Sequence, residues 1–379
     1  MVTTVAHAYP WDLVGDPAAA ERIAALGVDA VALAASYHTV RAATPLHPRH
    51  RLVDARHAAF YLPVRPRAWG RLVPAAPTWV DGENPYGAAS DALRAVGLPV
   101  HAWTVLTHSS RLGDLHPDLV VRNAFGDRYP YALCPANPDV AEYAAALVTE
   151  VLDQGAPDGV VLEACGPLGF THGGHHEKTD GADWGPVAQK LLSLCFCAAC
   201  ERRYPDADAV RAAVRAGVDG GAPGVEEALG EWAAGVRAAR TALSRDLRRD
   251  LVGLVRAAGA KAVVHATADP WGTGPFATVA DGVGVDVDVL TLTCWGGPEA
   301  SLPAIEALRE AAPGVPIAAY VLALPPRTAD AAALVEEWRH YGVDELHLYH
   351  AGLASADRMS AMGEALGTLR GQPVLHPRV

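Results

Sequence analysis

Eight short β-branched or apolar runs alternate with alanine-rich stretches from one end of the chain to the other, at 2–9, 30–37, 99–107, 159–165, 262–268, 288–295, 316–324 and 345–352. Parallel strands joined by helices produce this alternation, because the strands are buried on both faces and each crossover needs a helix. An open, doubly wound sheet is the alternative. The count of eight and the lack of a G-x-G-x-x-G motif after the first run favour a closed barrel.

The joins between the helical stretches and the runs support the same architecture. The phrases AALGVDAV, RAVGLPVHAW, RAAGAKAVV and HYGVDELHL each place a glycine just before the next run. Glycine adopts the left-handed conformation that ends many helices, so the chain can turn directly into the following strand. We predict an α/β fold, a (β/α)8 TIM barrel, and a single domain over 1–379, because no low-complexity linker divides the chain.

Two connections are long, at 38–90 after the second run and at 166–225 after the fourth. Both should emerge on the C-terminal face of the barrel, where barrel enzymes build their sites. A long helix is expected from Val225 to Gly259, since leucine, valine and tryptophan recur there at helical spacing. Its apolar stripe should pack on the exterior of the barrel.

Composition excludes some partners. The formal charge of −12 argues against nucleic acid, because a phosphate backbone needs a basic face. The chain begins without a basic segment followed by an apolar one, and no run approaches roughly 18 uncharged apolar residues. We therefore expect no membrane partner and a cytoplasmic location. The sequence predicts no oligomeric state.

Three of the six cysteines, Cys195, Cys197 and Cys200, lie within six positions in CFCAAC. Cys-x-Cys-x-x-Cys can bring three thiolates to one tetrahedral ion, and a closed site needs a fourth ligand. Cys134, in YALCPANPDVAEY, is a loop thiol just before a helix start. Free thiols or a different fourth ligand are the alternatives, and the remaining two cysteines, near strand ends, are typical small buried hydrophobes.

The stretches CPANPDVAEY and CFCAACERRYP resemble the paired zinc-binding stretches of glycoside hydrolase family 42 β-galactosidases and related glycosidase-like barrels. The resemblance covers about 129–204 together with the barrel pattern. It implies a TIM-barrel glycosidase with one structural zinc that pins the loops after strands 3 and 4. The implied zinc ligands are Cys134, Cys195, Cys197 and Cys200.

Glycoside hydrolysis in most families needs two carboxyl groups beside the scissile bond. Glu163 ends the fourth run in DGVVLEAC, and a carboxyl buried at the C-terminal end of a barrel strand is a candidate catalytic residue. Family 42 places an asparagine before this glutamate, where this chain has Leu162, and a nucleophile on strand 7, where this chain offers only Tyr320. Asp269, in HATADPWG, is the first candidate for the second carboxyl, with an Asp-Pro turn as the alternative interpretation. Glu177 and Asp12 are weaker candidates.

Histidines and aromatic residues fall at or just beyond several predicted strand ends. Aromatic faces stack on sugar rings while histidine and arginine bond hydroxyl groups, so the mixture suits a carbohydrate or another polar small molecule. Lys178 is also a candidate clamp for an anionic group. The candidate substrate-binding residues are His7, Tyr9, Trp11, His38, Arg41, Trp103, His108, His172, His175, His176, Lys178, His265, Trp295, Tyr320 and His350.

The leading hypothesis is a glycoside-hydrolase-like enzyme acting on a carbohydrate-like small molecule, with Glu163 and Asp269 as the catalytic carboxyls. A metal-dependent hydrolase or lyase using Glu163 and two or three histidines is a second hypothesis, although no H-E-x-x-H motif occurs. A non-catalytic barrel that binds a sugar is the third.

Overall fold

The computed structural model describes residues 2–171, 178–280, 285–322 and 331–370. Its centre is a closed barrel of eight parallel strands within the described chain, because β1 pairs with both β2 and β14. Seven of the strands lie within a predicted run and β10 starts one residue before its run, so the (β/α)8 prediction is confirmed and the open sheet is excluded. The barrel strands are β1 (Thr3–Ala8), β2 (Ala30–Tyr37), β6 (Val100–Val105), β9 (Gly159–Glu163), β10 (Lys261–Thr267), β12 (Val289–Thr293), β13 (Ile317–Leu322) and β14 (Glu345–Tyr349).

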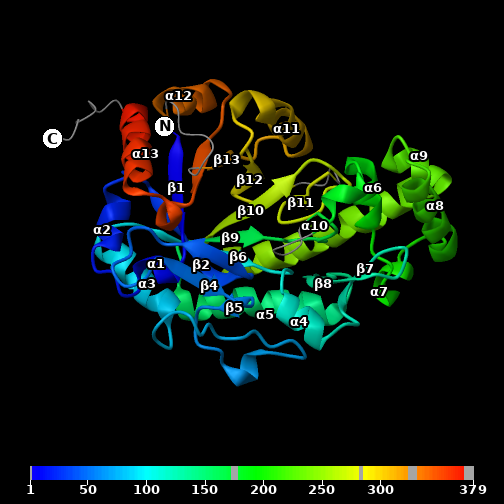
Figure 1. The fold of residues 1–379 in the computed structure, drawn as a ribbon, viewed down its shortest axis with the longest axis horizontal. Coiled ribbons are helices and arrows are strands. Elements are labelled where there is room, and N and C mark those ends of the chain that lie inside the picture. The colour runs from blue at the N-terminus through cyan, green and yellow to red at the C-terminus, as the bar shows by residue number, and fades with distance from the viewer. Residues whose placement is uncertain (1, 172–177, 281–284, 323–330, 371–379) are drawn as a thin grey trace.

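Helices surround this barrel (Figure 1), and their buried faces carry alanine, leucine and valine. One crossover differs from the others: between β10 and β12, residues 268–280 and 285–288 contain no helix and only the short strand β11 (Ala277–Thr278). A pocket of about 420 Å³ lies there, against the outer side of both strands. The surrounding helices are α1 (Pro10–Leu13), α2 (Ala19–Ala24), α3 (Pro85–Ala95), α5 (Pro138–Gly155), α10 (Ala233–Ala257), α11 (Pro298–Ala311), α12 (Ala331–His340) and α13 (Ala356–Leu369).

The four predicted glycine joins are confirmed. Gly27, Gly97, Gly259 and Gly342 have φ between 69° and 84°, and each lies a few residues before a barrel strand. An L side chain rarely adopts this conformation, so glycine releases each helix into its strand at low cost. Ala156 makes the corresponding join between α5 and β9 with φ of 40°, which no glycine signal marks.

Three connections on the C-terminal side are long, one more than predicted. The connection after β2 holds β3 (Val40–Ala43), β4 (Leu52–Ala55), β5 (Ala59–Phe60) and η1 (Pro66–Ala68). The unpredicted one follows β6 and holds α4 (Ser110–Leu115) and the hairpin of β7 (Val120–Arg122) and β8 (Arg128–Leu133). It was missed because β7 has only three residues and β8 contains a proline, which argues against a strand.

The connection after β9 forms a lobe at one side of the barrel (Figure 1). The lobe has a small hydrophobic core of its own, around Leu191, Phe196, Val214 and Leu229. The single-domain assignment stays a prediction. The lobe's elements are η2 (Asp180–Ala182), α6 (Pro186–Leu192), α7 (Ala198–Glu201), α8 (Ala207–Asp219), α9 (Val225–Leu229) and η3 (Gly230–Trp232).

The long helix expected from Val225 to Gly259 is wrong in its first part. Gly230 has φ of 52°, so the chain leaves α9, passes through η3 and starts α10 at Ala233. From there the predicted apolar stripe is buried, as at Leu243, Leu247 and Leu251. None of the helices in the described part of the chain combines the length and the apolar composition needed to span a membrane.

Gly113→Ala is expected to lower the free energy of unfolding by about 3 kcal/mol. A Cβ at Gly113 would lie 1.7 Å from the backbone oxygen of Pro130, so α4 would have to move away from β8. Denaturant unfolding measures the change. Gly253→Ala is the control, because a Cβ at this exposed position of α10 meets no atom within 4 Å and should raise stability by up to about 1 kcal/mol. Equal effects would contradict the close packing of α4.

Candidate active site and cysteine cluster

Glu163 is the last residue of β9 and lies buried inside the C-terminal end of the barrel. Ala164, the next residue, has φ of 57°, and its amide donates to the Pro275 carbonyl at 2.8 Å, which fixes the chain as it leaves the strand. The indole Nε1 of Trp103 donates to Glu163 Oε2 at 2.7 Å. Burial raises the pKa of Glu163 to about 7, and the Trp103 hydrogen bond limits the rise. A carboxyl in this state can hold or release a proton near neutral pH.

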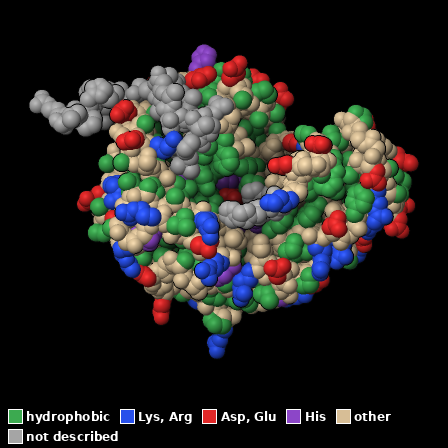
Figure 2. Space-filling view, viewed as in Figure 1, with side chains coloured by type: hydrophobic (Ala, Val, Ile, Leu, Met, Phe, Trp, Pro, Cys, Tyr) green, Lys and Arg blue, Asp and Glu red, His purple; other side chains and the backbone are tan. Residues whose placement is uncertain are grey.

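Aromatic rings from four barrel strands and the segments after them surround this carboxyl. Trp103 contacts Tyr37 at 4.6 Å and Tyr9 at 5.7 Å between ring centroids. Tyr9 stacks on His350 at 4.1 Å, and its hydroxyl lies 3.4 Å from that of Tyr349. The space-filling view shows one face of the molecule hollowed near its centre, with acidic and histidine atoms at the bottom of the hollow (Figure 2). The predicted convergence of aromatic residues at the strand ends is therefore present around Glu163.

Two histidines of the predicted set lie in the barrel interior, His265 beside Glu163 and His7 beside Trp103. His265 Nδ1 is 3.6 Å from Glu163 Oε2, and the ring stacks on Phe276 at 4.8 Å. The His7 ring lies 4.7 Å from Trp103 and 4.8 Å from Tyr320. Burial lowers the pKa of His265 to about 3 and lowers that of His7 well below its usual value. Both rings are therefore neutral at neutral pH, so they offer one acceptor and one donor each.

The other predicted binding residues lie at different distances from this centre. Trp11 stacks on Tyr9 at 4.3 Å, and His38 stacks on His108 at 4.4 Å. Trp295 is 45% exposed and lies 6.0 Å from Tyr320.

Two predicted residues, Arg41 and Lys178, lie at the surface, and four further candidates fall on residues that the structure does not describe. Arg41, on β3, is exposed and lies 3.7 Å from Asp54, and Lys178 is also exposed. The remaining predictions, His172, His175, His176 and Glu177, lie outside the described residues.

Asp269 is held in a turn. Its Oδ1 accepts from the amide of Trp271 at 2.9 Å, and its Oδ2 pairs with Lys190 Nζ at 2.6 Å. About a third of its side chain is exposed, in the wall of the pocket between β10 and β12. These contacts match the turn interpretation, and they tie β10 to the lobe.

Asp12 is a second buried carboxyl near the aromatic group. It accepts from the Tyr9 amide at 2.8 Å, and His350 Nδ1 lies 3.8 Å away. Burial raises its pKa to about 7, against the Tyr9 hydrogen bond. A Cβ at Gly352 would lie 2.0 Å from its carboxyl, so the backbone closes over Asp12 from that side.

Sequence reasoning missed three residues that the structure places in the barrel interior or beside it. Phe276 covers one face of His265 from a connection without a strand or helix pattern. Lys261 and Glu345 are the first residues of β10 and β14, and their side chains form an ion pair at 2.5 Å. They lie at the N-terminal end of the barrel, opposite to the C-terminal end that holds Glu163, which we call the mouth. A charged residue opening an otherwise apolar run is the signal that marks both.

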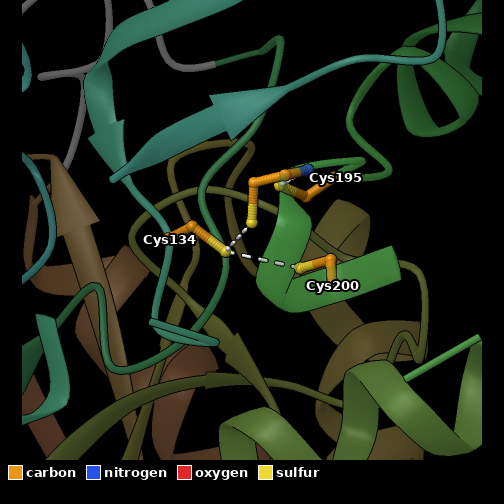
Figure 3. A group of neighbouring side chains, drawn as sticks. Cys134, Cys195 and Cys200 are labelled. Carbon is orange, nitrogen blue, oxygen red and sulfur yellow. Dashed lines mark hydrogen bonds between the residues drawn. The ribbon is translucent and has the colours of Figure 1, made fainter. Parts of the chain in front are cut away.

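The four cysteines named in the zinc prediction lie together. Cys134 follows β8, Cys195 and Cys197 precede α7, and Cys200 lies within it. Cys134 Sγ is 3.4 Å from Cys200 Sγ and 3.7 Å from Cys197 Sγ, and all four sulfur atoms lie within 4.8 Å of one another (Figure 3). All four are buried and none forms a disulfide. Among the described residues they are the only group of three or more His, Cys, Asp or Glu side chains whose ligand atoms converge in this way.

The cysteine cluster fits a tetrahedral ion. Metal–sulfur bonds of about 2.3 Å place tetrahedral sulfur atoms about 3.8 Å apart, close to the observed separations. Hydrogen bonds from Cys134 and Cys195 lower the pKa of Cys197, and the Cys197 amide donates to Cys195 Sγ at 3.4 Å. The guanidinium of Arg240, buried on α10, lines the same small cavity as Cys195 and Cys200. Its positive charge would offset part of the negative charge of four thiolates around a divalent ion.

No protein-family model matches the chain, and no curated protein matches it. Among solved structures, the chain is similar to the catalytic domain of a β-amylase from Paenibacillus polymyxa, with a TM-score of 0.59, 13% identity and coverage of 98% of this chain and 99% of that one. The chain is also similar to an α-L-fucosidase isoenzyme 2 from Paenibacillus thiaminolyticus, with a TM-score of 0.56, 13% identity and coverage of 98% of this chain and 49% of that one. For a β-galactosidase from Marinomonas ef1 the TM-score is 0.54 and the identity 13%, with coverage of 98% of this chain and 61% of that one.

The chain is a TIM barrel, like each of these three structures. At 13% identity the likeness establishes the fold alone, and the chain spans about half the length of the fucosidase. None of these comparisons assigns it to glycoside hydrolase family 42.

Proposed function

We propose that this protein is a glycoside-hydrolase-like enzyme that acts on a carbohydrate or carbohydrate-like small molecule, with Glu163 as its general acid/base. The observation that carries the proposal is a buried carboxyl at the end of β9 whose pKa is raised to about 7 inside an aromatic wall. Glycosidases need such an acid, protonated near neutral pH, to protonate the leaving oxygen. The similar solved structures, an amylase, a fucosidase and a galactosidase, make a carbohydrate the natural substrate class.

Each part of the mouth has a role in this proposal. The rings of Trp103 and Tyr320 offer faces for sugar stacking, and neutral His7 and His265 offer acceptors and donors to hydroxyl groups. Protonated Glu163 donates to the leaving group, and its anion, once formed, is stabilised by the Trp103 hydrogen bond. Asp269 remains our first candidate for the second carboxyl, and it must leave Lys190 to serve. Asp12 is the alternative, since it is buried and also has a raised pKa.

We further propose that Cys134, Cys195, Cys197 and Cys200 hold one structural zinc ion. A set of four thiol ligands with no open position suits a structural ion rather than a catalytic one. When bound, zinc would join the connection after β6 to the lobe after β9 and supply rigidity to both. Glu163 lies at the end of β9, so the ion stabilises the segment that leaves the catalytic strand.

Turnover of p-nitrophenyl glycosides tests the proposal. A panel that varies the sugar and the anomeric configuration should identify at least one substrate whose hydrolysis declines as pH rises through about 7, because Glu163 then loses its proton. If a carbohydrate binds but no member of the panel is hydrolysed, the protein is a sugar-binding barrel. If chelation removes activity while the fold is retained, the metal-dependent hydrolase is the better hypothesis.

Trp103→Phe is expected to shift the alkaline limb of this pH profile to higher pH. The Trp103 hydrogen bond favours ionised Glu163, so its loss raises the pKa of the carboxyl and keeps it protonated over a wider range. The rate at pH 6 should fall about tenfold, because the new anion loses one hydrogen bond. Steady-state rates between pH 5 and pH 9 provide the measurement. A shift to lower pH would show that Trp103 does not stabilise the anion.

A further inference from the structure

A chain of polar contacts runs through the barrel interior towards Glu163. It starts where Lys261 Nζ meets Glu345 Oε1 at 2.5 Å, at the first residues of β10 and β14. Glu345 Oε2 lies 3.3 Å from His347 Nε2, and His347 Nδ1 lies 3.3 Å from His7 Nε2. His347 is two residues along β14 from Glu345, and His7 is near the C-terminal end of β1. The contacts therefore climb from the bottom of the barrel towards its mouth.

The direction of each hydrogen bond follows from the ends of this chain. Burial raises the pKa of Glu345, but the His347 hydrogen bond and the Lys261 ammonium outweigh it and lower the pKa to about 2. An ionised carboxylate can only accept, so His347 donates from Nε2. When His347 carries a single ring proton and this proton faces Glu345, its Nδ1 accepts and His7 donates to it from Nε2. This leaves His7 Nδ1 as a bare acceptor.

That acceptor is buried and, among the described residues, has no hydrogen-bond partner. Both ring nitrogens of His265 and the hydroxyl of Thr291 also lack a hydrogen-bond partner among the described residues. Thr291, on β12, lies opposite His265, on β10, in the strand register. Each buried polar atom without a partner costs roughly 1 to 3 kcal/mol, and barrel interiors are normally filled with branched apolar side chains. A ligand that supplies hydroxyl groups would satisfy these atoms.

We propose that Lys261, Glu345, His347 and His7 form a relay that fixes the His7 tautomer, so that His7 Nδ1 accepts a hydrogen bond from a hydroxyl group of the bound carbohydrate. The inference rests on the proposed function for its ligand class, and it adds a specificity-determining residue outside the pair of carboxyls. His7 reads a hydroxyl donor, and a deoxy sugar at that position leaves its acceptor unsatisfied. The three residues behind His7 are positioning residues, because they act through its ring.

Nitrogen-15 spectra of histidine-labelled protein test the tautomer directly, with His7→Gln identifying the His7 signals. The wild type should show neutral His7 with its proton on Nε2. In the double variant Lys261→Met, Glu345→Leu, His347 loses its acceptor without stranding a charge, and the His7 signals should shift to those of a tautomer mixture. The control Thr104→Val removes one hydroxyl from a buried strand position outside the relay. A proton on Nδ1 in the wild type, or an unchanged spectrum in the double variant, would overturn the relay.

Titration with D-galactose, D-glucose and L-fucose tests the ligand contact without turnover. A bound hydroxyl should move the His7 Nδ1 signal of the wild type and of Thr104→Val, and the double variant should bind about tenfold more weakly. If a sugar binds without moving this signal, His7 does not contact it and the inference fails while the proposed function stands. If the signal moves but no glycoside is hydrolysed, the proposed function fails and the binding role of His7 stands. Absence of binding by all three sugars counts against both.

Discussion

Glu163→Gln should lower kcat by about three orders of magnitude for any glycoside that the wild type hydrolyses. The amide oxygen can still accept from Trp103, so the site keeps its shape and KM should change by less than about threefold. An amide cannot transfer the proton that a carboxyl with a pKa of about 7 provides. Steady-state kinetics at pH 6, where the wild-type carboxyl is protonated, gives the largest contrast.

A matched control is available on α5. Glu150 is as buried as Glu163, but it accepts from Arg65 at 2.7 Å on the outside of the barrel. Glu150→Gln should lose stability and keep its kcat. Asp269→Asn then addresses the second carboxyl, because a catalytic Asp269 would lower kcat while a turn residue would change stability alone. Full activity in Glu163→Gln would exclude the proposed acid/base.

The second large effect is expected at the cysteine cluster. Native protein should contain one equivalent of zinc, and Cys134→Ser should contain far less and lose more than about 3 kcal/mol of stability. Cys134 is the one ligand outside the CFCAAC stretch and contacts two of the other three sulfur atoms, so its loss opens the site. Metal analysis and thermal unfolding measure the two quantities.

Cys294→Ser is the control for this experiment. Cys294 is buried and free, and it lies outside the cysteine cluster. This variant should keep one equivalent of zinc despite some loss of stability. A full equivalent in Cys134→Ser, or none in the wild type, would show that the four cysteines do not form the proposed site.

The barrel could be predicted because its signals are local. Each buried parallel strand appears as an apolar run, and a residue such as Gly27 or Gly342 marks a helix end by its left-handed backbone. The connection after β6 could not be predicted, because the strands β7 and β8 owe their pairing to each other and to α4 rather than to their own composition.

In the candidate site too, the residues with a local sequence signal could be predicted, and the contacts between distant residues could not. Glu163 and the aromatic residues were accessible from the rule that barrel strand ends converge, since that rule needs only the strand boundaries. The contacts of Asp269 with Lys190 and of Glu345 with Lys261 join residues 79 or more positions apart, and no periodicity reports which distant side chains meet. Phe276 has no regular element to announce it, and its position follows from the packing of His265.

The crossover from β10 to β12, whose described residues contain no helix, leaves these two strands less well covered than the others. Where β10 and β12 pair, a pocket of about 420 Å³ lies between their outer side and Ala304, Ala307 and Leu308 of α11. Amide hydrogens of these two strands should therefore exchange with deuterated solvent through local openings that need less energy than global unfolding. At the other barrel strands, a helix packed on the outer side has to move away before the strand can separate from its neighbours. Phe276 lines this pocket and also stacks on His265, so such openings would expose the histidine beside Glu163 to solvent.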